Sequence, residues 1–258
     1  MNKLSLKQLT VLSTNKITAN MQRITLQGNT LADFSHECEG NYIKLLFNPI
    51  GETDLSTMTE GEKTIMRTYT IRRFSPIDHT IEIDFVRHIT QDLQCGFAAR
   101  WAMNAKKGDT INIVGPGTIK EMNTHTDWFL MVADMTALPA LSAKIKKLPH
   151  DAEGYAIIKI IETNDIQLIA APSNFKVIWI TEKKSLVDTV KSLTWLTSTV
   201  SVWTACEFDS MRQLRNYFRN EKQVAHENIY ISSYWKKGVS EDGHKVIKKQ
   251  DATEYNVF

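Results

Sequence analysis

The sequence predicts two domains, an N-terminal antiparallel β-barrel or sandwich followed by a C-terminal α/β domain with a parallel sheet. The chain has 258 residues, which is enough for two domains of ordinary size. Up to about residue 120, short strand-like segments alternate with turn-rich connections, whereas strands and helices alternate beyond it. We therefore expect domains at 1–120 and 121–258.

The N-terminal half contains five predicted strands and one predicted helix. Over 80–88, Ile81, Ile83 and Phe85 alternate with other residues, the pattern of a strand with one buried face. The predicted strands are 17–28, 41–48, 67–74, 80–88 and 109–117, and the helix is 97–105. Such short strands favour an antiparallel barrel or sandwich.

The C-terminal half alternates strands with helices. The predicted strands are 127–134, 155–162, 175–180, 200–206 and 228–234, and the helices are 136–148, 185–193 and 207–221. In the last helix, Phe208, Met211 and Phe218 recur at helical spacing, with Leu214 or Arg215 between them. This alternation predicts a parallel sheet covered on both faces, whose ligands bind at the carboxyl ends of the strands.

Composition narrows the functional classes. No apolar run is long enough to span a bilayer, and the start lacks the apolar core of a signal peptide, so we expect a cytoplasmic protein. Lys and Arg number 31 against 29 for Asp and Glu, which argues against nucleic-acid binding by overall charge. The three cysteines lie far apart and predict no metal cluster, so redox chemistry requires an organic cofactor. No apolar stripe indicates a partner subunit, and we expect a monomer.

The stretch "RTYTIRRF" (67–74) combines strand-forming residues with three arginines. On a regular strand Arg67 and Tyr69 share one face and Thr70 points to the other. A flat ring, a hydroxyl and guanidinium groups suit a nucleotide with a planar head. A barrel strand with arginines that extend into solvent explains the same residues without a ligand.

Arg67, Tyr69 and Thr70 form an R-x-Y-T motif that resembles the flavin motif of the ferredoxin reductase superfamily. The longer match is to its siderophore-interacting proteins, the ferric-siderophore reductases. Further segments resemble motifs of that branch in order along the chain: "DFVRH" (84–88), "CGFAARWA" (95–102), "GDTINIVGPG" (108–117), "ADMTALPA" (133–140), "WTACEF" (203–208) and "SYWKKG" (233–238).

The resemblance implies a noncovalent FAD on the N-terminal domain. Tyr69 is expected against the isoalloxazine and Thr70 near its N5 edge as the catalytic, flavin-positioning pair, with Arg67 on phosphate. The expected FAD-binding residues are Arg67, Tyr69, Thr70, Ile71, Arg72, Asp84, Phe85, Val86, His88, Gly96, Phe97, Ala98 and Ala99. Independently, residues 96–99 open the predicted helix, where free backbone N–H groups bind anions. A hydrogen-bonded histidine at a strand end is the alternative for His88.

The C-terminal motifs imply a nicotinamide nucleotide beside the flavin. Its expected contacts are Asp134, Thr136, Ala137, Cys206, Glu207 and Trp235. The chain has Met135 where the family has Glu and Cys206 where it has Gly, and a buried free cysteine is the alternative for Cys206. Thr136 by itself is only a helix-capping signal. Glu162 and Glu182 after strands favour the free ribose of NADH over NADPH, although two lysines follow Glu182.

The implied electron acceptor is a ferric siderophore, bulky and anionic, for which lysines provide attraction. The candidate contacts are Lys44, Lys120, Lys236, Lys248 and Lys249, against the alternatives of a strand-edge lysine and a disordered basic tail. The resemblance thus implies a cytoplasmic NAD(P)H-dependent ferric-siderophore reductase that releases Fe(II). The alternatives are a reductase fed by ferredoxin, a general flavin reductase, or a non-catalytic siderophore-binding flavoprotein.

Overall fold

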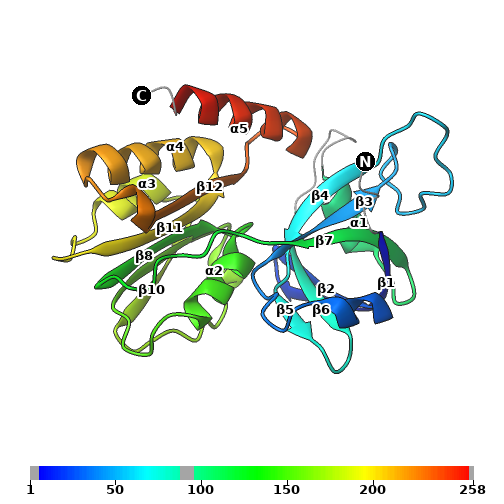
Figure 1. The fold of residues 1–258 in the computed structure, drawn as a ribbon, viewed down its shortest axis with the longest axis horizontal. Coiled ribbons are helices and arrows are strands. Elements are labelled where there is room, and N and C mark those ends of the chain that lie inside the picture. The colour runs from blue at the N-terminus through cyan, green and yellow to red at the C-terminus, as the bar shows by residue number, and fades with distance from the viewer. Residues whose placement is uncertain (1–5, 88–95, 256–258) are drawn as a thin grey trace. The chain divides into compact units, whose positions relative to one another are not determined.

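The computed structural model describes residues 6–87 and 96–255. The chain divides into two compact units, Met1–Ile119 and Lys120–Phe258, each described here by itself (Figure 1). The first unit has an antiparallel sheet and the second a parallel one, which confirms the predicted fold class. No helix of the described ranges is long and apolar enough to cross a membrane.

The first unit is a barrel of antiparallel strands in the order β4-β3-β7-β1-β2-β6-β5. The strands are β1 (Lys7–Thr18), β2 (Met21–Gln27), β3 (Tyr42–Phe47), β4 (Ile65–Thr70), β5 (Arg73–Ser75), β6 (Thr80–Val86) and β7 (Thr110–Gly117). Only Ile71 and Arg72 separate the two edge strands, β4 and β5. Ile71 N donates to Asn41 O beside β3, and Arg72 N donates to Glu82 O on β6, both at 2.8 Å. This change of partner between consecutive residues closes the barrel.

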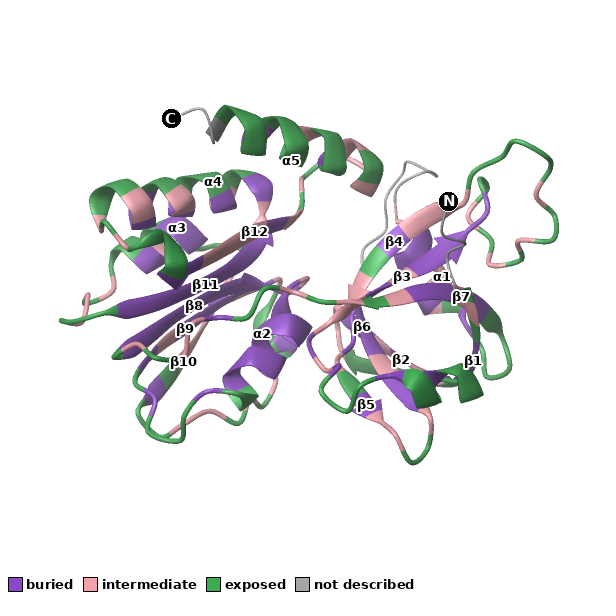
Figure 2. Ribbon diagram, viewed as in Figure 1, coloured by how far each residue is buried: buried purple, intermediate pink, exposed green. Residues whose placement is uncertain are grey.

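Helix α1 (Phe97–Asn104) packs against the barrel core. The inward residues of β3 and β6, such as Ile43, Ile83 and Phe85, are fully buried. The Trp101 ring of α1 meets Phe85 edge to face, with ring centres 5.8 Å apart. Figure 2 shows in purple the buried residues along these strands. A short 3-10 helix, η1 (Asn29–Asp33), follows β2.

The first strand differs from the prediction. Residues 17–28 are not one strand, because β1 ends at Thr18 and β2 begins at Met21 after a tight turn. The β1 strand was missed because only its Leu9 and Val11 are buried, so polar residues dominate its sequence.

The second unit is a five-stranded parallel sheet in the order β10-β9-β8-β11-β12. Its strands are β8 (Trp128–Asp134), β9 (Gly154–Ile160), β10 (Phe175–Thr181), β11 (Val200–Glu207) and β12 (Ile229–Trp235). Figure 1 shows α2 (Leu138–Lys146) on one face, with α3 (Leu186–Lys191) and α4 (Phe208–Asn216) on the other. Short helical turns are η2 (Thr163–Asp165), η3 (Tyr217–Glu221) and η4 (His226–Asn228). The strand order reverses between β8 and β11, the place where open α/β sheets bind ligands.

The basic C-terminal segment forms a packed helix, α5 (Glu241–Tyr255), rather than a disordered tail. His244 is buried and its Nε2 lies 2.8 Å from Ser233 Oγ on β12. Arg215 of α4 donates twice to the Asp251 carboxylate, at 2.6 and 2.8 Å. The sequence prediction overlooked these polar anchors because they pair residues far apart in the chain.

Candidate functional site

Strand β4 presents its motif residues on both of its faces. Tyr69 pairs with the fully buried Ile43 of β3 and shares its inward face, whereas Thr70 pairs with Tyr42 on the outward face. Arg67 pairs with Leu45 and therefore lies on the same face as Tyr69. The ladder ends at Thr70, where the chain bends from β3 towards β6. The end of β4 is thus a position where a planar ligand can meet both a ring and a hydroxyl.

Arg67 reaches the start of helix α1. Its guanidinium is largely buried, donates to Met66 O at 2.9 Å, and has its carbon 5.8 Å from the centre of the Phe97 ring. Arg100 approaches the same ring at 5.1 Å. Gly96, with φ 75°, precedes the helix, and Ala98 and Ala99 follow Phe97 in its first turn. Two guanidinium groups beside a helix N-terminus form a donor set that suits a diphosphate, as FAD binding requires.

Tyr69 rests on the barrel core. Its ring centre lies 4.3 Å from that of Phe85, with 40° between the ring planes. Phe85 and Ile71 are fully buried, so their side chains support the motif from behind, while Val86 at the end of β6 is half-buried. Thr70 is 8% exposed, and its hydroxyl has no hydrogen-bond partner among the described residues. The pair therefore combines a fixed ring with an available hydroxyl.

Asp84 and Arg72 belong to an ion cluster on the other face of β6 from Phe85. Arg23 donates to both Asp84 oxygens, at 2.6 and 2.9 Å, and this hydrogen bond raises the pKa of Arg23. Arg72 Nε lies 3.6 Å from Asp84 Oδ2, and burial lowers the pKa of Arg72 although the Asp84 charge opposes this shift. Arg23 was absent from the predicted site because no motif marks it. His88 lies outside the described residues.

In the second unit, Asp134 joins the carboxyl ends of three strands. Its Oδ1 accepts from Thr136 N at 2.9 Å and Thr136 Oγ1 at 2.5 Å. Its Oδ2 accepts from Glu207 N at 2.9 Å and from the Trp235 indole Nε1 at 2.8 Å. Burial raises the pKa of Asp134, although these four donors act in the opposite direction. Asp134, Thr136, Glu207 and Trp235 therefore meet at the switch point of the sheet.

The remaining C-terminal site residues have distinct local roles. Thr136 does not cap α2: the cap position is Ala137, which makes no side-chain hydrogen bond, because the Thr136 hydroxyl is held by Asp134. Glu207 caps α4, accepting from Asp209 N at 2.7 Å and Ser210 N at 3.1 Å. Cys206 is fully buried, and burial raises the pKa of its thiol well above the ordinary value.

A break in strand pairing exposes Trp235. Cys206 pairs with Ser233, but the next residue, Glu207, pairs with Trp235, so β12 carries one extra residue at this point. The bulge and the bond to Asp134 fix the indole, which remains 38% exposed. A held, exposed indole at the carboxyl edge of a parallel sheet is available to stack on a planar ligand.

The five candidate lysines differ in their engagement. Lys44 lies on the outward face of β3, opposite Thr68 and beside the Thr70 position, and has no ion pair among the described residues. Lys236 is paired with Asp209 at 2.8 Å, and the Lys248 ammonium donates to Ser232 Oγ at 2.7 Å. Lys120 and Lys249 are exposed. Among the described residues, Lys44, Lys120 and Lys249 have neither an ion pair nor a side-chain hydrogen bond, so their charges are the least compensated of the five.

The polar residues after the strands of the second unit also have local partners. Glu162 and Asp165 form a reciprocal cap on η2. Within the described ranges, no group of three His, Cys, Asp or Glu side chains could hold a metal ion.

The first unit is thus a barrel whose β4 residues suit a flavin, and the second is a parallel sheet with a ligand-type switch point. Residues 10–119 match the family model described as siderophore-interacting FAD-binding domain, and residues 126–238 match that of siderophore-interacting protein. The chain belongs to the siderophore-interacting protein family and carries its FAD-binding domain. This confirms the resemblance drawn from the motifs.

Similar proteins span nearly the same length. Ferric vibriobactin reductase ViuB of Vibrio cholerae is 28% identical over 88% of both chains. The NADPH-dependent ferric-chelate reductase of Escherichia coli is 26% identical over 91% of this chain and 94% of its own. The crystal structure of the siderophore-interacting protein SipS from Aeromonas hydrophila has a TM-score of 0.84 at 27% identity, covering 96% of this chain and 98% of that one.

Proposed function

We propose that this protein is an FAD-dependent reductase that passes electrons from a nicotinamide nucleotide to a ferric siderophore, releasing Fe(II). One observation carries the proposal: the chain has both the flavin motif on β4 and, in the parallel sheet, a strand-order reversal between β8 and β11 with the exposed Trp235 indole beside it. Two relatives named as ferric reductases support the substrate class.

The chain's own residues bind and orient. Arg67 and the start of α1 would hold the FAD diphosphate, Tyr69, fixed on Phe85, would support the isoalloxazine, and the Thr70 hydroxyl would be available to donate to it. Bound FAD supplies the conversion of a two-electron donor into one-electron steps. No side chain has to act as acid, base or nucleophile on the iron complex, because weaker binding of Fe(II) by hard oxygen ligands releases the metal.

At the second unit, the nicotinamide nucleotide binds at the switch point. Asp134 keeps Thr136 and Trp235 in place, and Trp235 offers a stacking surface. The Glu207 side chain caps α4 and the Cys206 side chain is buried in the core. We therefore expect these two residues to contact the nicotinamide nucleotide through their backbone atoms. Lys44, Lys120 and Lys249 attract the anionic siderophore by charge.

The decisive experiment is anaerobic reduction of the FAD-loaded protein. We expect NADH or NADPH to bleach the flavin absorbance, and a ferric siderophore to restore it while a ferrous chelator develops its colour. The two nicotinamides are compared at equal concentration, since Glu182 after β10 favours NADH and the name of the Escherichia coli relative favours NADPH. Failure of both donors to bleach the flavin refutes nicotinamide use, and bleaching without siderophore-dependent reoxidation refutes the proposed acceptor.

A further inference from the structure

Arg72 follows the flavin motif, and its guanidinium group lacks a hydrogen-bond acceptor. Its backbone N donates to Glu82 O at 2.8 Å, where the chain passes from β4 to β5. The side chain is 18% exposed, and its Nε is buried. No described residue accepts a hydrogen bond from any nitrogen of this guanidinium. Burial of such donors is costly unless a ligand accepts from them.

The carboxylate beside Arg72 is already bonded by another arginine. Arg23 of β2 donates to both Asp84 oxygens, at 2.6 and 2.9 Å. Arg72 Nε lies 3.6 Å from Asp84 Oδ2, which is close enough for attraction but too long for a hydrogen bond. The Asp84 side chain is 1% exposed, so water screens these charges little. Arg23 therefore satisfies Asp84, and Arg72 stays beside the carboxylate with its donors unused.

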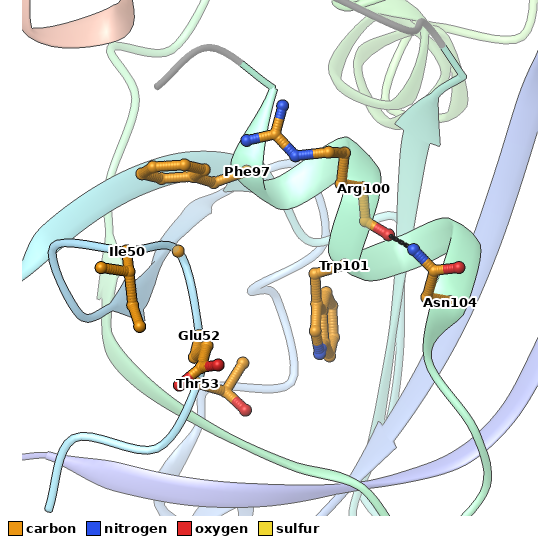
Figure 3. A pocket seen from close by; sticks show the side chains of 8 residues that line it. Ile50, Glu52, Thr53, Phe97, Arg100, Trp101 and Asn104 are labelled. Atoms are coloured by element: carbon orange, nitrogen blue, oxygen red, sulfur yellow. Dashed lines mark hydrogen bonds between the residues drawn. The ribbon is translucent and has the colours of Figure 1, made fainter. Parts of the chain in front are cut away.

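The position of Arg72 along the chain indicates which part of a flavin it meets. Figure 3 shows Phe97 and Arg100 projecting from the start of α1, and Arg67 and Arg100 approach the Phe97 ring at 5.8 and 5.1 Å. These cations suit the phosphate end of the cofactor. Arg72 comes two residues after Thr70, whose hydroxyl is expected at the N5 edge. Because the C4 carbonyl adjoins N5, a donor just beyond Thr70 is placed for the pyrimidine half of the ring.

We infer that Arg72 donates to the pyrimidine half of the bound flavin, and that Arg23 is the positioning residue that keeps Arg72 available for it. The assignment rests on the proposed flavin function and adds to it a residue that no motif marks. A hydride brings two electrons and one proton, so the reduced ring carries a negative charge spread over N1 and the pyrimidine carbonyls. A guanidinium beside these atoms binds reduced FAD more tightly than oxidised FAD and raises its reduction potential.

Arg23 supports Arg72 in two ways that have the same sign. It neutralises Asp84, whose charge would otherwise cancel that of Arg72 at short range. It also occupies both carboxylate oxygens, since without it the Arg72 guanidinium could close the gap of 3.6 Å and form its own two-bond pair. Burial lowers the pKa of Arg72 and the Arg23 charge adds to this shift, so the two cations lie within electrostatic reach of each other.

The test measures the midpoint potential of FAD bound to the full chain. Arg23→Gln should lower it by the equivalent of about tenfold weaker binding of reduced relative to oxidised FAD, the scale of one charge-assisted hydrogen bond, or about 30 mV for a two-electron couple. Arg23→Gln combined with Asp84→Asn should restore the potential, because no carboxylate then captures Arg72. The matched control is Arg73→Gln, which removes the same charge at the exposed next residue and should leave the potential unchanged.

Three results overturn the inference: an unchanged potential in Arg23→Gln, an equal shift in Arg73→Gln, or a double variant whose potential stays low. The last result would mark a merely structural ion pair, which removal of its second half does not restore. If Arg23→Gln does not fold, Asp84→Asn alone decides, because it removes the negative charge beside Arg72 and should raise the potential; a potential that does not rise refutes the inference. A protein that binds no FAD refutes the flavoprotein proposal itself, so the two failures are distinguishable.

Discussion

Replacing Asp134 by alanine should strongly destabilise the second unit. The carboxylate accepts from Thr136 N, Glu207 N and the Trp235 indole, and these three donors come from the ends of different strands. In the alanine variant they lose their acceptor in a site where Asp134 was 8% exposed. Each buried unsatisfied donor costs about 1–3 kcal/mol, and removal of a costly buried carboxylate offsets part of the loss. We expect the free energy of unfolding to fall by about 3 kcal/mol, which is near the lower bound of the summed cost of the three donors.

Urea unfolding followed by tryptophan fluorescence measures this effect, because all tryptophans except Trp101 lie in the second unit. Asp134→Asn keeps one acceptor oxygen and should lose about half as much. Asp151→Ala, in an exposed turn, is the matched control and should stay within about 0.5 kcal/mol of the unaltered protein. A loss in the free energy of unfolding below about 1 kcal/mol in Asp134→Ala would show that water or a shifted side chain replaces the carboxylate. That result would refute the claim that Asp134 holds the ends of the three strands together.

Three further predictions concern other parts of the chain. Gly51→Ala should destabilise the first unit more than Gly61→Ala, because both glycines have φ near +90° but only at Gly51 would a Cβ meet the Phe97 ring. Urea unfolding should show a loss of about 1 kcal/mol for Gly61→Ala and a larger loss for Gly51→Ala. Equal losses would contradict the contact with Phe97. Burial and the Lys248 charge lower the pKa of His244 against the opposing charges of Glu241 and Glu207, so the unfolded chain takes up the proton more readily. Stability should therefore fall as pH drops below about 6.5, and His244→Gln should flatten this slope in thermal melts between pH 7.5 and 5.5; an unchanged slope would exclude His244 as its source. Burial raises the pKa of the Cys38 thiol to about 11 and that of the Cys206 thiol well above its ordinary value. Both thiols should therefore resist iodoacetamide in the native protein and react after unfolding, as peptide mass spectrometry can check.

Local patterns were sufficient for most elements of the fold. The period-two pattern of 80–88 and the apolar spacing of Phe208, Met211 and Phe218 report burial of one face, and the structure has β6 and α4 there. Leu214, rather than Arg215, is the buried residue between them, and Arg215 pairs with Asp251 of α5 instead. The failure at β1 has the same origin, since a strand with few buried residues carries little pattern.

The site was predictable where a motif marks it and hidden where partners come from distant segments. R-x-Y-T located β4, but the bend at Ile71 and Arg72 depends on hydrogen bonds to Asn41 and Glu82. Likewise, the sequence indicates Asp134 and Trp235 separately, whereas only the fold shows that one accepts the indole of the other. The pocket lined by residues 50–53 and helix α1 had no sequence signal, because Asn48 orders this loop by accepting from backbone N–H groups, and many loops could make such bonds.

Both candidate sites arise where regular strand pairing is interrupted. In the barrel, β4 leaves β3 after Thr70, so the ring of Tyr69 and the hydroxyl of Thr70, on opposite faces, become available near one strand end. In the parallel sheet, the extra residue of β12 turns Trp235 towards Asp134 at the switch point. A continuous ladder would bury or separate these groups, because alternate residues of a strand point to opposite faces. Irregular backbone supported by a buried core thus provides rigid, accessible positions for planar ligands. A protein whose cofactor performs the electron transfer needs such positions, because its own part is to bind and orient that cofactor.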